Sequence, residues 1–312
     1  MKPFRKNLAI AIDGGGIRGV IVTRALAMLE AQLGTPLHEL TRLTTGTSTG
    51  AIIAAGIGAG LSGSQMYGLY TQLGEVVFPK SWRTTFFPFF VRYKYSNEPL
   101  ETALRLHIGD RLMVEFWNTD PPMDVVITAF DLIANRTRFI KPWKTQHAGW
   151  SVVKAVLASS AVPTYFPVVD GRYIDGGVGS YGNPSYIAAY ELVHCLGWDP
   201  RETTLLSLGT GRDPHTLKTG EADRFYAWDW LEPVLDAFSV SAADQQVHLV
   251  KTFFPDLDFR RFQVDLQRPI AMDDIGAIAE LTRYGDVMGR MILADDIDRA
   301  QKMIIKGAPL RL

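Results

Sequence analysis

Residues 46–50 read Gly-Thr-Ser-Thr-Gly, a spacing that can place a reactive serine on a sharp turn. The G-x-S-x-G pattern lies between a short strand-like run and an apolar helical pattern, which is the setting of a nucleophile elbow. Because Gly46 and Gly50 lack a Cβ, the turn can close and leave the Ser48 hydroxyl at the head of a helix. The N–H groups and positive dipole end of that helix favour a developing oxyanion. The pattern also arises by chance in glycine-rich chains, but this setting favours acyl transfer.

A second glycine-rich loop, "DGGGIRG" at 13–19, follows another apolar run. Its spacing G-x-G-x-x-G is that of a dinucleotide-binding loop and is carried by Gly14, Gly16 and Gly19. That fingerprint also needs an acidic residue at the end of the next strand, and neither Glu30 nor Glu39 stands there. A phosphate-binding P-loop would need a lysine after the last glycine, where valine stands. A nucleotide site, an anion-binding loop and a plain tight turn therefore remain alternatives for this stretch.

A nucleophilic serine needs a base, usually a histidine that a carboxylate orients. None of the histidines has surroundings that single it out: they are His38, His107, His147, His194, His215 and His248. The stronger signal is Asp175, which follows a short strand-like run and precedes Gly176 and Gly177. It has the same local form as Asp13 before its own glycines.

Together these residues resemble the patatin-like phospholipases, lipid acyl hydrolases with a serine–aspartate dyad. The resemblance is carried, in the family's order, by "DGGGIRG" (13–19), "GTSTG" (46–50) and "DGG" (175–177). Two further stretches fit, "ASSAVPTYFPVV" (158–169) and "LSLGTG" (206–211), so the resemblance spans about 8–211. The remainder of the chain carries no motif of the family.

The resemblance implies that Ser48 is the nucleophile and Asp175 its base. It implies that the glycine loop is an oxyanion hole, which binds the negative oxygen that forms on an ester carbon, and not a pyrophosphate site. The residues of this oxyanion hole are Gly14, Gly15, Gly16 and Arg18. The N–H groups of Gly15 and Gly16 are the expected donors. The residues expected to support these motifs are Asp13, Gly19, Gly46, Gly50, Gly176 and Gly177. The implied reaction cleaves phospholipids, lysophospholipids or neutral glycerides through an acyl-Ser48 intermediate, and neither metal nor organic cofactor is expected.

An aspartate is a weak base for this reaction. The unperturbed pKa values of aspartate and histidine are about 3.9 and 6.5, a difference of roughly 3.5 kcal/mol in proton affinity. We expect a dry, apolar pocket to raise the pKa of Asp175, as desolvation does for other catalytic carboxylates.

The pattern of elements predicts an α/β fold of three layers, a mostly parallel sheet flanked by helices, with a helical C-terminal portion. Strands are expected at 8–12, 123–131, 137–143, 172–174 and 203–209, with another short strand before Ser48; helices are expected at 20–33, after Ser48, at 151–160 and at 184–196, where Asn183 can cap. From about 220 to 312 the pattern is mostly helical around a strand at 259–266. No linker divides the chain, so residues 1–312 are expected to form one catalytic domain whose motif-bearing core spans about 8–211.

The amino-acid composition limits the classes of binding partner and the cellular locations that we expect for this protein. The 312 residues are 47% hydrophobic and carry 32 basic and 33 acidic side chains, so no excess of positive charge argues for nucleic acid. Cys195 is the single cysteine, which excludes an internal disulfide, and we expect a buried thiol. The first apolar run is too short for a signal peptide and no transmembrane helix is predicted, so a cytoplasmic location is expected.

The segment 78–95 mixes aromatic residues with Lys80, Arg83, Arg92 and Lys94, a composition that suits a cap over the site or transient contact with a membrane surface. Two other functions stay open. A nucleotide-binding oxidoreductase would use the glycine loop for a cofactor but leaves the other motifs unexplained. A patatin-like effector that is silent or activated by a ligand would keep the same residues. The sequence does not decide the oligomeric state.

Overall fold

The computed structural model describes residues 1–312 except 80–91, 121, 215–216, 227–228, 300 and 302–312. Its core is a seven-stranded sheet in the order β4-β3-β2-β1-β6-β7, with β5 paired to β3 off this path. The strands are β1 (Asn7–Ile12), β2 (Thr41–Gly46), β3 (Asp124–Asp131), β4 (Arg136–Ile140), β5 (Tyr173–Asp175), β6 (Thr203–Leu208) and β7 (Asp258–Phe262). Strands β3, β2, β1, β6 and β7 are parallel, whereas β4 and β5 run antiparallel to β3. The predicted mostly parallel α/β sheet is confirmed.

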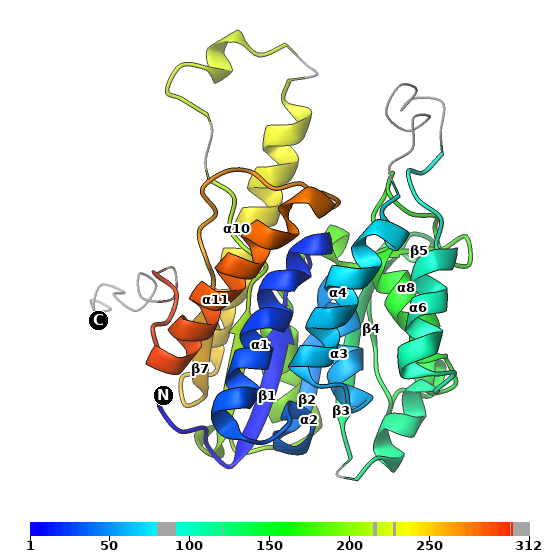
Figure 1. Ribbon diagram of the computed structural model, residues 1–312, viewed down its shortest axis with the longest axis vertical. Coiled ribbons are helices and arrows are strands. Elements are labelled where there is room, and N and C mark those ends of the chain that lie inside the picture. Colours follow the sequence, from blue (N-terminus) through cyan, green and yellow to red (C-terminus); the bar gives the residue numbers. More distant parts are fainter. Residues whose placement is uncertain (80–91, 121, 215–216, 227–228, 300, 302–312) are drawn as a thin grey trace.

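Helices cover both faces of this sheet (Figure 1). They are α1 (Gly19–Leu33), α2 (Leu37–Leu40), α3 (Thr49–Gly58), α4 (Gly63–Val77), α6 (Glu98–Ile108), α7 (Thr145–Ala148), α8 (Val152–Ser160), α9 (Ser185–Tyr190), α10 (Leu231–Phe253) and α11 (Ile278–Ala294). Strand β1 shows how its residues serve two layers. Leu8, Ile10 and Ile12 point into the core beneath α1, α3, α4, α8 and α11, while Ala9 and Ala11 face α9 and α10. A central parallel strand is buried on both faces, so it reads as an unbroken apolar run.

The C-terminal portion is helical as expected in α10 and α11, but it also contributes to the sheet. Strand β7 pairs with β6 in parallel, from Thr204 opposite Asp258 to Leu208 opposite Phe262. Helix α11 packs along α1 on the outer face (Figure 1). Residues that carry no family motif therefore complete the sheet that holds the motifs.

Two local expectations need correction. The helix expected over 184–196 is α9 followed by a π-helical turn, Glu191–Cys195, while the Asn183 side chain does accept the N–H of Ser185 at 3.0 Å. Cys195 is exposed, not buried, because Leu192 and Leu196 take the inward positions. Within the described residues, no helix is long and apolar enough to cross a membrane.

Candidate active site

Ser48 stands at the junction between β2 and α3, in a backbone conformation that only a constrained turn maintains. Its φ of 55° and ψ of −123° are rare for a residue with a side chain. The Ser48 N–H donates to Ser159 Oγ at 2.8 Å, and the Gly50 N–H closes the turn onto the Thr47 carbonyl at 2.7 Å. This geometry is the elbow that the sequence predicts.

The two glycines of the elbow are required by close backbone contacts. A Cβ on Gly46 would lie 2.0 Å from the carbonyl oxygen of Gly50, and a Cβ on Gly50 would lie 2.2 Å from that of Ile12. Both obstacles are backbone atoms, which cannot rotate away. The glycines therefore let α3 begin directly against the ends of β1 and β2.

Asp175 is the last residue of β5 and lies in the same buried region as Ser48, each being 6% exposed. Its N–H donates to the Ala161 carbonyl at 3.1 Å, and its Oδ1 accepts the Gly177 N–H at 2.7 Å. Asp175 Oδ2 is buried and has no hydrogen-bond partner of regular geometry among the described residues. One carboxylate oxygen is thus anchored and the other is left for a reacting group.

Burial raises the pKa of Asp175 from 3.8 to about 6. The Ser48 hydroxyl and the Gly177 N–H act in the opposite direction, because both stabilise the charged form, but desolvation outweighs them. Among the described residues no hydrogen bond of regular geometry joins Ser48 to Asp175 Oδ2, and catalytic hydrogen bonds are often long in the absence of substrate. A carboxylate with this pKa is a stronger base than free aspartate, in line with the expectation.

The loop of Gly14, Gly15 and Gly16 passes beside the elbow. A Cβ on Gly14 would lie 3.3 Å from Ser48 Cβ. The Gly14 N–H is already used, since it donates to the Gly182 carbonyl at 2.9 Å. Among the loop hydrogen bonds of the described residues, the N–H groups of Gly15 and Gly16 donate to none. The loop therefore offers two available N–H donors in place of three.

The absence of side chains in this loop has a steric cause. A Cβ on Gly15 would lie 2.3 Å from Thr210 Oγ1, and one on Gly16 would lie 2.3 Å from the Met272 carbonyl oxygen. Gly16 also has a φ of +58°, which favours glycine. A Cβ on Gly19, at the start of α1, would lie 2.5 Å from Thr49 Oγ1.

Two charged residues of the motif are held by ion pairs. Arg18, at the end of the short 3-10 helix η1 (Gly16–Arg18), donates to Asp213 at 2.6 Å, so its guanidinium is tied to the loop after β6. Asp13 forms a buried bidentate pair with Arg261 of β7, at 2.8 and 2.5 Å. Asp13 thereby fixes the start of the glycine loop to the sheet.

Three residues of the site were not predicted. Ser159 accepts the Ser48 N–H, Arg261 pairs with Asp13, and Thr210 Oγ1 donates to the Gly14 carbonyl at 2.5 Å. Arg261 was signalled by the sequence "FRRF", because a charged residue inside a buried strand needs a partner. A Cβ on Gly176 would lie 2.1 Å from Thr128 Oγ1, so this position has no room for a side chain.

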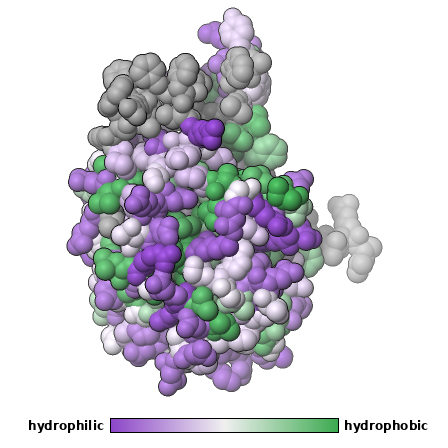
Figure 2. Space-filling model, turned by 90° about the vertical axis from the view of Figure 1, so that its right-hand side faces the viewer, coloured by the Kyte–Doolittle hydropathy of each residue, from purple (hydrophilic) through white to green (hydrophobic). Residues whose placement is uncertain are grey.

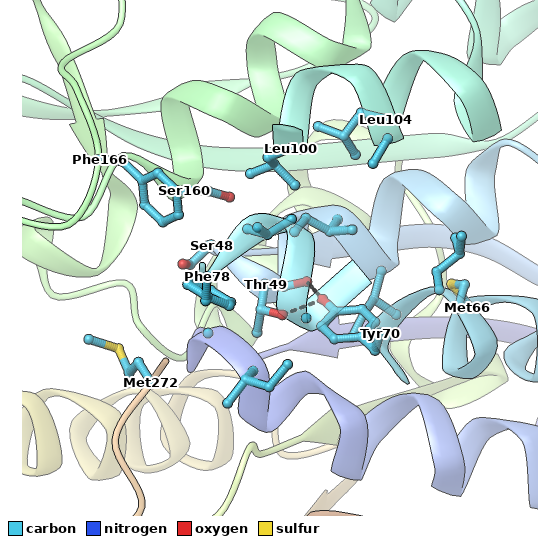
Figure 3. Close-up of a pocket in the computed structure, with 18 of the residues that line it drawn as sticks. Ser48, Thr49, Met66, Tyr70, Phe78, Leu100, Leu104, Ser160, Phe166 and Met272 are labelled. Carbon is cyan, nitrogen blue, oxygen red and sulfur yellow. Dashed lines mark hydrogen bonds between the residues drawn. The ribbon is translucent and has the colours of Figure 1, made fainter. Parts of the chain in front are cut away.

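An apolar pocket begins at Ser48 and runs between α3, α4 and α6 (Figure 3). It encloses about 980 Å³ of empty space, including the solvent at its mouth. Ser160, Phe166 and Met272 line the pocket on the side of Ser48, and Leu100, Leu104 and Met66 line it farther from Ser48. The thioether and hydrocarbon lining suits a hydrocarbon chain and offers little to a charged ligand.

Among the described residues no hydrogen bond joins a histidine to Ser48 or Asp175, and His215 lies outside those residues. His107 lines the pocket, and His147 is buried, where desolvation lowers its pKa to about 4. No cluster of three or more metal-binding side chains occurs among the described residues. Of the segment 78–95, residues 80–91, with Lys80 and Arg83, lie outside the described residues. At its far end, Lys94 and Tyr95 both contact Asp273.

Comparison with known proteins places this geometry in a family. The chain is 27% identical over 271 residues to a cGAMP-activated phospholipase of Vibrio cholerae, covering 77% of this chain and 74% of that protein. It is 30% identical over 294 residues to calcium-independent phospholipase A2-gamma of Mus musculus, covering 85% of this chain but 36% of that protein. The sequence model of the patatin-like phospholipases matches residues 10–188, a range that holds the elbow, the glycine loop and Asp175. This chain belongs to the patatin-like phospholipase family.

Proposed function

We propose that this protein hydrolyses carboxylic esters of lipids through a dyad of Ser48 and Asp175. The observation that carries the proposal is the position of Ser48, on a strained elbow at the mouth of an apolar pocket and beside a buried carboxylate of raised pKa. Family membership favours this function over a nucleotide-binding oxidoreductase, the other use of a G-x-G-x-x-G loop.

In the acylation half of the reaction, Asp175 accepts the Ser48 hydroxyl proton as Oγ attacks the ester carbonyl carbon. The carbonyl oxygen becomes the oxyanion of a tetrahedral intermediate, and the N–H groups of Gly15 and Gly16 donate to it. Each such donor contributes a factor of about 10²–10³ in rate. Collapse of the intermediate expels the alcohol, which takes the proton from Asp175, and leaves acyl-Ser48.

In the deacylation half, Asp175 removes a proton from a water molecule that attacks the acyl carbon. A second tetrahedral intermediate forms and breaks the bond to Ser48 Oγ, which recovers its proton from Asp175. The fatty acid leaves and the starting state returns. One carboxylate thus acts as base and acid in both halves.

The pocket supports a long acyl group as the part of the substrate that enters the protein. Leu100 and Leu104 of α6 and Ile52 and Ile53 of α3 are among the apolar side chains that line it. Burying each methylene of a fatty chain contributes roughly 0.8 kcal/mol, so a chain gains affinity with length until the pocket is full. Phospholipids, lysophospholipids and neutral glycerides all satisfy this requirement, and phospholipase relatives favour the first two.

Some relatives are named for an activator, cGAMP in Vibrio cholerae and cUMP-AMP in Escherichia coli. A need for such a ligand would leave the same dyad and pocket in place. The activity test therefore includes arms with and without each dinucleotide, so that a dormant enzyme is told from an inactive one.

The test is labelling with a fluorescent fluorophosphonate, which forms a covalent adduct with activated serines, followed by peptide mass spectrometry. We expect label on Ser48, none in Ser48→Ala, and strongly reduced label in Asp175→Asn. Ser239→Ala, an exposed serine on α10, is the matched control and should label as the wild type does. Fatty-acid release from phosphatidylcholine vesicles is measured in parallel. Folded protein that neither labels nor releases fatty acid, with or without the dinucleotides, would refute the proposal.

A further inference from the structure

Helix α10 projects beyond the body of the protein at its N-terminal end, with the preceding loop as its tip (Figure 1). From Val234 to Ser239 every residue is exposed, so this part of the helix faces solvent on all sides. We call the described residues of this region, 217–226 and 229–239, the arm. A free-standing helix of this kind is marginal in water unless something packs against it.

The exposed residues of the arm are not those of a solvated helix. Trp230, Val234 and Phe238 recur at intervals of four, so they share one side of α10, and Leu235 lies next to them. They are 47%, 40%, 71% and 58% exposed, respectively. Tyr226, in the loop before the helix, is 81% exposed. Trp230, Val234, Leu235 and Phe238 form an apolar face, which we call the arm face, and Tyr226 is a further exposed aromatic residue of the arm.

The surface pictured on the side of α6 differs from the arm face. The side that carries α6 mixes hydrophilic and hydrophobic residues (Figure 2). Single exposed apolar residues such as Leu106 and Ile133 are normal on a protein surface, whereas a grouped set marks an interaction site.

The charges of the arm argue against a lipid bilayer as the occupant. The tip, around the 3-10 helix η7 (Ala222–Arg224), exposes side chains of both signs: Lys218, Glu221, Asp223, Arg224 and Asp229. Insertion of the tip would carry these charges into the membrane at high cost. An amphipathic helix that binds membranes also carries basic residues on its polar side, whereas here Asp236 and Ser239 lie there.

We propose that the arm face is a self-association surface, on which α10 of one copy packs against α10 of a second copy in a two-fold arrangement. A two-fold pair places the same residues on both sides, so apolar faces apolar and the Asp236 side chains stay outside. The three aromatic residues expose roughly 400 Å² per copy, since such side chains bury about 150–250 Å² each. Both copies with their aliphatic neighbours come near the lower limit of about 1,200 Å² for specific interfaces. Full burial of this surface would place the pair among small, weak interfaces, so the test covers micromolar concentrations.

The test is sedimentation velocity of the full chain from about 1 to 100 µM. We expect a concentration-dependent dimer for the wild type and a monomer throughout for Phe238→Asp, because each substitution places two charges in the interface. Ile133→Asp, which changes an equally exposed residue in the β3–β4 turn, is the matched control and should dimerise normally. Circular dichroism verifies that the variants are folded.

A second measurement locates the contact. In a Cys195→Ser background, Val234→Cys should form an intermolecular disulfide under mild oxidation, whereas Ile133→Cys should not. A wild type that stays monomeric at 100 µM, or a Phe238→Asp protein that dimerises as well as the wild type, would overturn the proposal. So would a monomeric wild type that phosphatidylcholine vesicles sediment in a Phe238-dependent way, since the bilayer would then be the occupant. Esterase activity does not enter these readouts, so they stand apart from the proposed function.

Discussion

The raised pKa of Asp175 predicts the acidic limb of the enzyme's pH profile. Only the ionised carboxylate can accept the Ser48 proton, so kcat/KM should fall as pH drops through the pKa of Asp175 in the free enzyme. Burial raises this pKa from 3.8 to about 6, a shift of about 2 units, which corresponds to about 3 kcal/mol of extra proton affinity.

The predicted pH dependence of kcat/KM differs clearly from the one that an unperturbed aspartate would give. With a pKa near 6, roughly a tenth of the enzyme is ionised at pH 5, so kcat/KM should be about tenfold below its value at pH 8. With a pKa near 3.8, more than roughly nine tenths would remain active at pH 5. The two cases differ by close to an order of magnitude at a single pH.

The assay uses a short, uncharged ester of 4-nitrophenol, which avoids titratable lipid head groups, followed at the isosbestic wavelength of the phenol and phenolate. His107→Gln is the control, because His107 lines the pocket, and it should leave the position of the limb unchanged. Circular dichroism at pH 5 excludes unfolding as the cause of the fall. A limb near 4 in folded enzyme would refute the reasoning, and stabilisation of the oxyanion would then have to supply the missing base strength.

Three further predictions concern stability. Asp175→Asn should stabilise the fold by about 1–3 kcal/mol at pH 8, because a carboxyl group whose pKa is higher in the folded than in the unfolded protein destabilises the native state once pH rises through that range. Urea unfolding should show this gain in stability at pH 8 and none at pH 3, and an equal gain at both pH values would contradict the prediction. Gly50→Ala should lower the free energy of unfolding by at least about 1–3 kcal/mol, since the new Cβ would meet the Ile12 carbonyl. Gly68→Ala in α4 has open space around the new Cβ and should be neutral or stabilising by up to about 1 kcal/mol, so similar urea midpoints for the two variants would argue against the steric account. Arg261→Met should lower the free energy of unfolding by about 3–5 kcal/mol because it leaves Asp13 buried without its counter-ion, and adding Asp13→Asn should recover part of that loss. An Arg261→Met protein as stable as the wild type would show that the ion pair is dispensable.

The parts of the structure that depend on neighbouring residues were predictable from the sequence. The elbow follows from five consecutive residues, Gly46 to Gly50, whose types allow one local geometry. The parallel sheet follows from alternating apolar runs and helical periodicities, which is why β1 and β6 lie within about a residue of their expected positions and β2 lies directly before the elbow, as expected. Asp175 was found because glycines follow it, a local pattern again.

The remaining features depend on residues that meet only in the folded chain. The Gly14 N–H is consumed by Gly182, and no spacing within the glycine loop indicates this. Arg261 reaches Asp13 across 248 positions, through the pairing of β7 at the sheet edge. The exposure of Cys195 follows from a π-helical turn, which shifts the register of side chains and has no reliable sequence signal.

Residues after β6 hold the glycine loop in shape, so the presence of the family motifs alone does not show that the site is intact. The Met272 carbonyl accepts the Ile17 N–H at 2.8 Å, and Arg261 holds Asp13, so both ends of the glycine loop are fixed by residues that follow the matched range 10–188. A gene truncated after residue 211 would still encode the elbow, the glycine loop and Asp175, and a motif search would still recognise it. Its product would lack the two contacts that hold the anion-binding loop in shape. Whether a gene encodes an intact copy of this protein is therefore better judged from Arg261 and the segment around Met272 than from the family motifs.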